Sequence, residues 1–382
     1  MLLIKNGYVK PMVGANIPNG CVLIGDDGKI LSVGTDLTAP AGCEVIDAEG
    51  RLVTPGLVEA HCHTGMISSA MRWEGSEINE KSDPVQPQLR SIDAINPRDE
   101  RVTESVAYGV TTICTGPGSA NVVGGTFVAM KTAGRRLEDM IVKYPLAMKC
   151  AFGENPKNYY GQAGKSPSTR MATAALLRDL LTKAKNYMEA KDAGKEPAYD
   201  AKLEAMIPVM KKEIPLKAHA HRADDILTSI RIAKEFDVRL TLDHCTEGHL
   251  IADILAEEGY PAFVGPFLDD KSKPELRNLT AANAGILHKA GVRVSIITDA
   301  PVISERRLAL CAGIAVSEGL DYEEGWRAVT INPACGTGIG DRVGSLEAGK
   351  DGDVVIWTAD PLTTVGAKAF VTVIDGKVVY KT

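Results

Sequence analysis

The sequence predicts an α/β protein: a (β/α)8 barrel of the TIM type, with a small β-sandwich domain formed by the N- and C-terminal segments. Three observations lead to this expectation. Both ends of the chain consist of short Val-, Ile- and Leu-rich runs separated by turn residues. The middle alternates apolar runs with helical stretches. The length of 382 residues accommodates one large domain and one smaller domain.

Composition restricts the class of protein. Apolar residues make up 45% and charged residues 24% of the chain, which is typical of globular proteins. The net charge of −6 disfavours binding to nucleic acid or to an anionic membrane surface. The chain also has no apolar run long enough for a transmembrane helix. We therefore expect a cytoplasmic protein that acts on a small molecule, without nucleic-acid or membrane partners, and a homo-oligomer is compatible with the sequence.

The two ends of the chain predict the β domain, which we assign to residues 1–55 plus 343–382. Both segments contain β-prone runs bounded by turn residues: Met1–Val9, Gly20–Ile24, Ile30–Val33, Asp353–Trp357 and Phe370–Ile374. The turn Asp375-Gly376-Lys377 then predicts a hairpin into the last strand, Val378–Tyr380. Strands at both ends of one chain indicate that the termini meet in a single domain.

Residues 56–342 predict the barrel, which we expect to be catalytic. Its strands are predicted from short apolar runs: Leu57–Ala60, Val110–Cys114, Leu146–Phe152, Leu216–Ala220, Arg239–Leu242, Ala262–Val264 and Val292–Ile297. A hairpin-like piece, Gly124–Met130, lies between the second and third. Its helices are predicted at Arg98–Tyr108, Arg170–Ala190, Asp200–Lys212, Asp224–Glu235, His249–Glu258 and Asn278–Ala290. About eight strands alternating with helices fit a (β/α)8 barrel. A doubly wound sheet is disfavoured because no GxGxxG motif opens an early helix.

Histidines stand where such a barrel keeps its chemistry. His61 and His63 end the first barrel strand, and side chains two apart on a strand point to the same face. His219 ends the fifth strand, His244 the sixth and Asp299 the last. The eight cysteines are scattered without a CxxC pair, so we expect no thiolate ligands. Imidazoles and a carboxylate at the carboxyl ends of barrel strands are typical of a catalytic zinc site.

These residues resemble the motifs of the amidohydrolase superfamily. The resemblance rests on Pro55-Gly56-Leu57-Val58-Glu59-Ala60-His61-Cys62-His63, on His219, His244 and Asp299, and on the tail Gly344–Trp357. It covers essentially the whole chain and is greatest for the imidazolonepropionase-related and prolidase-like group. The resemblance implies a metal-dependent hydrolase of amide or other C–N bonds. It also implies zinc as the cofactor, as one or two divalent ions, with Mn, Fe or Co as alternatives.

One metal ligand has two candidates. Members of the superfamily bridge two metals with a carboxylated lysine or use a glutamate from a middle strand, and this chain offers both Lys149 and Glu154. Five residues apart on a regular strand, the two would face opposite sides. Glu154 lies at the predicted strand end, and we favour it as the ligand. Lys149 lies deeper and is expected either to fill a layer of the barrel or to extend its stem toward solvent, with a carboxylated lysine as the alternative.

Three further residues complete the expected site. His221 and Arg222 follow a metal histidine and are expected to face the pocket. His221 would help to polarise the substrate carbonyl. Arg222 would bind a substrate carboxylate, with pairing to Asp224 or Asp225 as the alternative. We also assign Asn155 to substrate binding.

The predicted reaction is hydrolysis by a water whose pKa is lowered by a bound divalent ion. Asp299, expected both as a ligand and as a catalytic residue, would accept the proton and pass it to the leaving nitrogen. The substrate would be a cyclic amide, a dipeptide or an N-acyl compound. One alternative is a deaminase of the same superfamily, although these usually carry a glutamate after the fifth-strand histidine, where this chain has Ala220-His221-Arg222. The other is a non-catalytic scaffold that kept the barrel.

Overall fold

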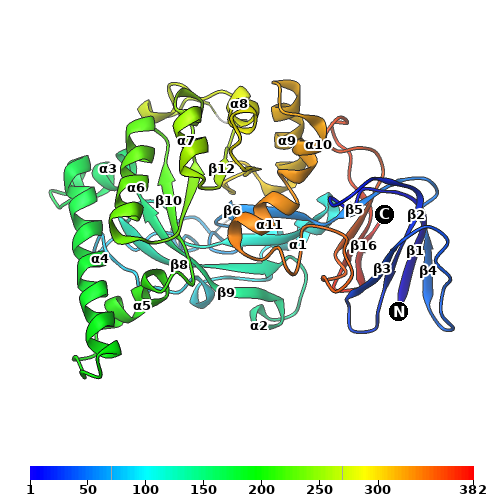
Figure 1. Cartoon of the computed structure of the whole chain (residues 1–382), viewed down its shortest axis with the longest axis horizontal. Helices are drawn as coiled ribbons and strands as arrows, with labels where there is room; N and C mark the ends of the chain where they lie inside the picture. The colour runs from blue at the N-terminus through cyan, green and yellow to red at the C-terminus, as the bar shows by residue number, and fades with distance from the viewer. Residues whose placement is uncertain (70, 269) are drawn as a thin grey trace.

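The computed structural model describes residues 1–69, 71–268 and 270–382. The chain forms two separate eight-stranded sheets, one from its two ends and one from its middle. Figure 1 shows the terminal sheet at one end of the molecule, with both chain termini on it, and helices α3 and α4 at the other. The predicted α/β class, a TIM-type barrel plus a separate β unit from both termini, is confirmed.

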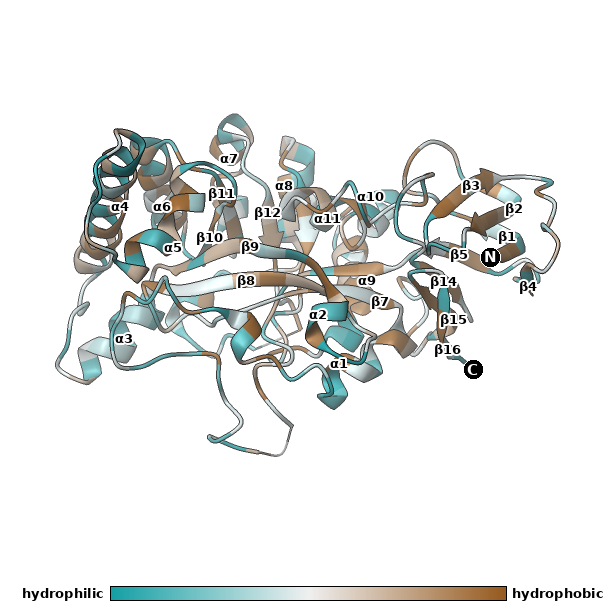
Figure 2. Ribbon diagram, turned by 90° about the horizontal axis from the view of Figure 1, so that it is seen from below, coloured by the Kyte–Doolittle hydropathy of each residue, from teal (hydrophilic) through white to brown (hydrophobic). Residues whose placement is uncertain are grey.

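The terminal sheet joins the two ends of the chain through β5 (Leu52–Pro55). This strand pairs in parallel with β1 (Leu2–Val9) and antiparallel with β14 (Val354–Trp357). The strand order is β16-β15-β14-β5-β1-β2-β3, with β4 beside β1. The remaining bounds are β2 Ile17–Ile24, β3 Ile30–Gly34, β4 Glu44–Asp47, β15 Ala369–Ile374 and β16 Lys377–Lys381. The apolar side chains of the terminal sheet form a hydrophobic core separate from that of the barrel. In Figure 2 the strands of this sheet accordingly carry hydrophobic colouring.

The barrel sheet has the order β13-β12-β11-β10-β9-β8-β7-β6. Its strands are β6 Leu57–Cys62, β7 Val110–Thr115, β8 Val123–Lys131, β9 Ile141–Ala151, β10 Leu216–Ala220, β11 Leu240–His244, β12 Ala262–Val264 and β13 Val294–Ile296. From β9 to β13 neighbouring strands are parallel, as are β6 and β7. Their carboxyl ends therefore lie on one side of the sheet, where barrel enzymes carry their active sites.

Strand β8 departs from the regular alternation, because it runs antiparallel to both β7 and β9. The chain reaches β8 from β7 through the short segment 116–122, and reaches β9 through helix α2 (Leu137–Met140). Parallel neighbours need a crossover of a dozen or more residues, which neither connection provides. The predicted hairpin-like piece is thus an integral strand of the barrel sheet.

The barrel closes between β13 and β6 through an inserted backbone segment. The N–H of Ile296 donates to the carbonyl of Ala328 at 2.8 Å, and the N–H of Val58 donates to the carbonyl of Val329 at 2.9 Å. The first and last barrel strands are therefore neighbours, but among the described residues they hydrogen-bond to this segment and not directly to each other.

Helices follow most of the barrel strands. Their bounds are α1 Glu100–Glu104, α3 Glu154–Gln162, α4 Arg170–Asp192, α5 Ala201–Met210, α6 Ala223–Phe236, α7 Ala252–Glu258, α8 Ala282–Ala290, α9 Leu308–Ser317, α10 Tyr322–Arg327 and α11 Ile331–Thr337. In Figures 1 and 2 helices α4, α6, α7 and α8 lie in a row in chain order. None of the helices in the described part of the chain has the length and apolarity needed to cross a membrane.

Candidate active site

The carboxyl ends of the barrel strands bring five of the predicted residues together. His61 lies on β6 and His63 just beyond it, while His219 lies on β10 and His244 ends β11. The His244 ring lies 5.0 Å from the His61 ring and 4.4 Å from the His219 ring, between centroids. Asp299 follows β13, and its Oδ1 atom is 3.2 Å from His63 Nε2 and 3.5 Å from His61 Nε2.

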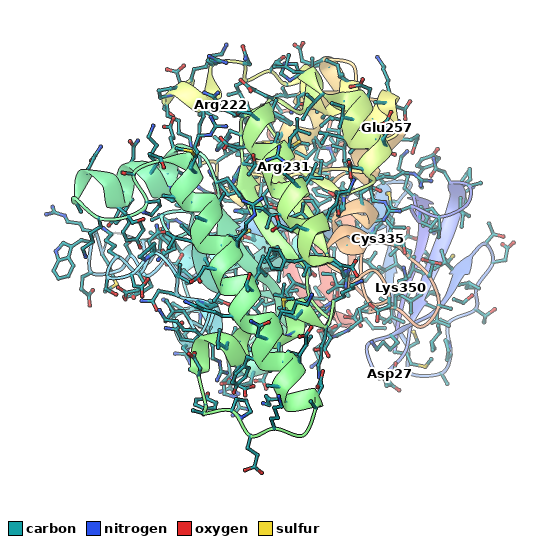
Figure 3. The ribbon with its side chains drawn as sticks, turned by 60° about the vertical axis from the view of Figure 1, so that its left-hand side comes forward. Asp27, Arg222, Arg231, Glu257, Cys335 and Lys350 are labelled. Carbon is teal, nitrogen blue, oxygen red and sulfur yellow. The ribbon has the colours of Figure 1, made fainter. Side chains whose placement is uncertain are left out.

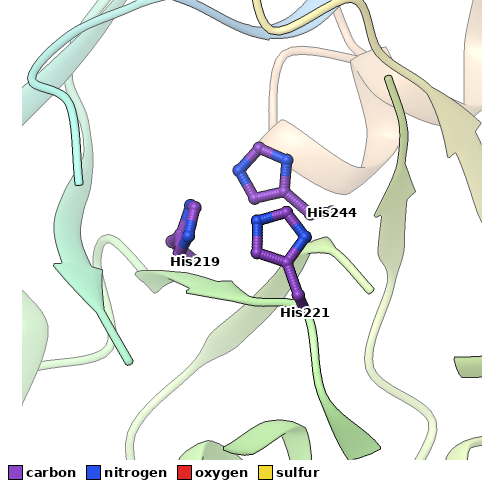
Figure 4. Close-up of side chains that lie close together, drawn as sticks. All are labelled: His219, His221 and His244. Carbon is purple, nitrogen blue, oxygen red and sulfur yellow. The ribbon is translucent and has the colours of Figure 1, made fainter. Parts of the chain in front are cut away.

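Two groups of three potential ligands share His244. One consists of His219, His221 and His244, and the other of His61, His244 and Asp299. Figure 4 shows the first group, in which the rings of His221 and His244 stack at 4.7 Å and His219 stands beside them. The predicted catalytic residue His221 is thus part of the same cluster as the predicted ligands.

Most of these imidazoles are held by their Nδ1 atoms, so that Nε2 faces the site. The Nδ1 partners are Asp243 Oδ2 for His61 at 2.7 Å, the carbonyl of Gly116 for His63 at 2.7 Å, the carbonyl of Gly265 for His244 at 2.9 Å, and Thr246 Oγ1 for His221 at 2.8 Å. Outer partners of this kind fix the ring orientation and the tautomer of metal-binding histidines.

The protonation states of the cluster suit a cation. Burial, reinforced by nearby positive charge, lowers the pKa of His61, His219 and His221, and burial also lowers that of His244. Burial raises the pKa of Asp299, but the imidazoles of His244 and His63 outweigh it and leave the pKa below its usual value. Neutral imidazoles and an ionised carboxylate are the forms that bind divalent metals.

Within the described part of the chain, two atoms of the cluster are buried without a hydrogen-bond partner: His244 Nε2 and Asp299 Oδ1. A buried polar atom without a hydrogen-bond partner lowers the stability of the fold unless a water or an ion binds it. Because both atoms are lone-pair donors and both face the other imidazoles, the donor set fits one or more divalent ions.

The backbone around the site is strained at three residues. His244, Cys245 and Asp299 adopt φ values of +68°, +47° and +53°. This left-handed region is unfavourable for residues other than glycine, and it persists where the surrounding structure enforces it. The strain falls on residues that bear or adjoin the predicted ligands, which is typical of functional sites.

Lys149 lies inside the barrel beside the histidines. Its side chain on β9 is completely buried, and Nζ is 3.2 Å from His61 Nε2. Burial lowers the pKa of Lys149 to about 8, with the ammonium of Lys217 adding to the effect and the carboxylates of Asp243 and Asp299 opposing it. This amine therefore loses its proton much more readily than a solvent-exposed lysine.

Glu154, which we favoured as the ligand, is placed elsewhere. It is the first residue of α3, and its Oε2 atom accepts a hydrogen bond from the backbone N–H of Glu275 at 3.3 Å. Strand β9 ends at Ala151, so the alternation used to compare the two candidates does not extend to residue 154. Of the two, the structure brings Lys149 to the histidines.

Of the two residues expected to bind substrate, Asn155 lies beside the histidines, whereas Arg222 is held in an ion pair. The Arg222 guanidinium pairs with both Asp224 oxygens, at 3.0 and 2.8 Å, at the start of α6. Arg222 is labelled in Figure 3. The alternative of an Asp224 partner is therefore what the structure shows. Asn155 Nδ2 is 3.2 Å from His219 Nε2, and the residue lines a cavity of about 420 Å³. The other residues lining this cavity are uncharged: Asn79, Ser119, Ala120, Asn158, Tyr159 and Gln162.

Several charged residues at the site escaped the sequence reasoning. Glu275 and Lys273 lie in the segment between β12 and α8, where Lys273 Nζ is 2.6 Å from Glu275 Oε1 and 3.2 Å from His221 Nε2. Below the site, Asp243 accepts from Lys217 Nζ at 3.2 Å as well as from His61. The sequence could have indicated Asp243 and Lys217, because a charged residue inside an apolar strand is buried and needs a charged partner.

Known proteins are similar to this chain over most of its length. The sequence profile of the amidohydrolase family matches residues 52–382. A crystal structure of an amidohydrolase from Thermotoga maritima MSB8 is 40% identical, superposes with a TM-score of 0.96, and the match covers 100% of both chains.

Two further relatives are similar in sequence. The amidohydrolase tasK of Hapsidospora irregularis is 29% identical over 388 residues, which are 94% of this chain and 39% of that protein. The chain therefore spans less than half of that relative's length. The imidazolonepropionase of Acidiphilium cryptum (strain JF-5) is 26% identical over 380 residues, which are 92% of this chain and 90% of that protein.

Proposed function

The chain belongs to the amidohydrolase family, in the group related to imidazolonepropionases, and from this premise we propose that it cleaves an amide or other C–N bond of a small molecule. Membership of the family makes it a metal-dependent hydrolase. The finer proposal concerns the bond, the ligands and the roles of individual residues. The observation that carries it is the pair of buried atoms without partners, His244 Nε2 and Asp299 Oδ1, within a cluster of inward-facing imidazoles.

The proposed ligands are His61, His63, His219, His244 and Asp299. The Nδ1 contacts of His61, His63 and His244 favour a preformed site, because these outer hydrogen bonds keep Nε2 aimed inward before any ion arrives. When bound, a divalent ion there would supply a Lewis acid that polarises a carbonyl and makes water more acidic.

We propose Lys149, as a carboxylated lysine, in the role that we first gave to Glu154. The ammonium first loses its proton, and addition of carbon dioxide to the neutral amine then forms a carbamate and releases a second proton, so that a cationic side chain becomes an anionic ligand. The burial of Nζ and its 3.2 Å contact with His61 Nε2 support this choice. Glu154 has neither feature, since its carboxylate bonds the backbone of Glu275.

The proposed chemistry assigns the proton transfers to Asp299. Its carboxylate stands between His61 and His63 at the carboxyl end of the barrel, where it can accept a proton from the attacking water. It would then donate that proton to the leaving nitrogen, so that the carboxylate is regenerated. His221, which contacts Lys273, is proposed to orient the substrate carbonyl.

Asn155 remains our proposed substrate-binding residue, whereas the ion pair of Arg222 with Asp224 removes the support for a role of Arg222. The cavity beside Asn155 has an uncharged lining rich in amide and hydroxyl groups. A lining of this kind favours substrates that present neutral hydrogen-bonding groups. Cyclic amides, dipeptides and N-acyl compounds with such groups are the substrates to test.

Metal analysis followed by a substrate screen tests the proposal. The purified protein should contain one or two equivalents of a divalent metal, and the His61→Asn and His219→Asn variants should lose metal while they stay folded. His288→Asn, on α8 and partly exposed, is the matched control and should retain it. A protein that neither contains divalent metal nor takes up Zn, Mn, Fe or Co would overturn the proposal. If metal binds, a lactam, dipeptide and N-acyl library should then reveal hydrolysis.

A further inference from the structure

The first and last strands of the barrel sheet, β6 and β13, are joined by few backbone hydrogen bonds among the described residues. Strands β6 and β13 share no ladder among the described residues, and the segment 328–329 lies between them. These are the strands that lead to His61 and to Asp299. Beyond the strands, one backbone bond links the two sides, from the N–H of His63 to the carbonyl of Ala300 at 2.7 Å. A further connection is needed to fix the lower part of the site.

Glu59 provides this connection with a single side chain. It is completely buried on β6, and its Oε1 atom accepts a hydrogen bond from the backbone N–H of His61 at 3.0 Å. Its Oε2 atom accepts from the backbone N–H of Thr298 at 2.9 Å and from the Thr298 hydroxyl at 2.6 Å. Thr298 directly precedes Asp299, whose backbone is in the strained left-handed region.

We propose that Glu59 is a positioning residue, which clamps His61 and Asp299 at their working separation across the junction of the first and last barrel strands. Its hydrogen bonds reach the backbone N–H of His61 on one side, and the backbone N–H and hydroxyl of Thr298 on the other. This inference rests on the proposed metal centre, because the separation that Glu59 maintains is that of two proposed ligands, His61 Nε2 and Asp299 Oδ1, at 3.5 Å.

The contacts explain why a carboxylate of this length is required. Both ends of the clamp are hydrogen-bond donors, so both oxygens must accept. In a Glu59→Gln variant the amide oxygen can serve Thr298, but the NH₂ group then faces the N–H of His61, donor against donor. In Glu59→Asp the side chain is one methylene too short to span both sides. Either change should let His61 and Asp299 move apart.

The test compares cobalt-substituted Glu59→Gln with the wild-type protein. We expect a changed visible absorption spectrum, because ligand geometry changes, and zinc affinity weaker by about tenfold or more in chelator competition. Thr298→Val, which removes one donor and keeps its shape, should change both readouts in the same direction by less. Matched controls are Glu305→Gln, at a buried carboxylate that bonds two hydroxyls, and Thr112→Val, at a buried hydroxyl with no partner. Both should leave the cobalt spectrum unchanged.

The outcomes separate this inference from the proposed function. A loss of thermal stability with an unchanged cobalt spectrum would make Glu59 purely structural and overturn the inference. If Glu59→Gln does not fold, an unchanged spectrum in Thr298→Val would have the same consequence. A wild-type protein that binds no cobalt would instead contradict the proposed metal centre. Spectral change in Glu59→Gln and Thr298→Val, with both controls unchanged, would establish the clamp.

Discussion

Individual carboxylates at this site differ in role because they differ in partners. Asp299 lies beside two imidazoles, and among the described residues its Oδ1 atom has no hydrogen-bond partner, which supports the proposed proton transfer. Asp243 is saturated by His61, Lys217 and Thr241 and can only orient. Glu275 pairs with Lys273 at 2.6 Å. The same functional group therefore has different partners at three positions, and only Asp299 is proposed to transfer protons.

Asp299→Asn tests the proton transfer. Asparagine keeps the shape of the side chain but cannot accept a proton, and general acid–base catalysis contributes about 10²–10⁴-fold. We expect kcat to fall by at least about 100-fold at neutral pH, with most of the metal retained by the histidines. Steady-state kinetics with a substrate from the screen, together with metal analysis, provide the measurement. A kcat within about threefold of wild type would exclude the proton-transfer role.

Lys149→Met tests the carboxylated lysine. Because the variant removes both the amine and any carbamate formed on it, we expect the occupancy of at least one metal position to fall. Added short carboxylic acids should restore part of the activity by supplying the missing carboxylate. Glu154→Gln is the control and should leave metal content nearly unchanged, since its carboxylate bonds the Glu275 backbone. Metal loss in Glu154→Gln, with Lys149→Met unaffected, would return the role to Glu154.

At the scale of elements, strand β8 shapes one flank of the barrel. Segment 85–90 runs beside it, with paired residues at Val85–Val123 and Arg90–Thr126. The close approach requires glycine at position 125, which has φ +114° and where a Cβ would lie 2.4 Å from the carbonyl oxygen of Leu89. The same segment lines a cavity of about 280 Å³ that also includes Met66 and Pro117.

Gly125→Ala should therefore destabilise the protein. The substitution adds a Cβ against a backbone atom and places alanine in an unfavourable conformation, which typically costs about 1–3 kcal/mol. Gly34→Ala is the control, since its Cβ would meet open space at an ordinary φ, and we expect a change within about 0.5 kcal/mol. Urea denaturation of both variants gives the comparison. If Gly125→Ala and Gly34→Ala were equally stable, segment 85–90 would be able to move away from the added Cβ at no cost in stability.

In the whole molecule, a buried ionic cluster joins the barrel to the terminal sheet. Lys131 on β8 lies 2.9 Å from Asp351 and 2.7 Å from Asp353, and Asp351 also pairs with Lys29 and Arg342. Burial raises the pKa of Asp351, but Lys131 and the other cations outweigh it and lower the pKa to about 2. The orientation of the terminal sheet against the barrel thus depends partly on ion pairs.

Lys131→Met should weaken this junction, because it leaves buried carboxylates without their cation. Removing one partner of a buried pair typically costs about 3–5 kcal/mol, whereas Arg136→Met, at the exposed pair with Asp139, should cost less than about 1 kcal/mol.

The pH dependence of stability gives a second measurement. Since the folded pKa of Asp351 lies below its ordinary 3.8, the contribution of Asp351 to the stability of the fold is complete above about pH 4 and disappears as the pH falls toward 2. Denaturation at several pH values should show the gap between Lys131→Met and wild type narrowing in that range. A gap that is constant with pH would contradict this account.

The fold class and the core of the candidate site are properties of the sequence. Apolar runs bounded by turn residues fix where strands form. Parallel strands that carry His61, His219 and His244 at their carboxyl ends must bring those side chains to one edge of the sheet. This part follows from local patterns, because a residue's place at a strand end is set by its immediate neighbours.

Only the tertiary structure decided the partners. The contact of Lys149 with His61, which supports our proposal of Lys149 over Glu154, became visible only in the structure. The ion pair of Arg222 depended on the start of α6, and the reversal of β8 depended on short connections. The contact of His61 with Asp243 joins residues 182 positions apart. Local sequence determines backbone conformation, whereas the partner of a buried charge is determined by which strands the whole chain places side by side.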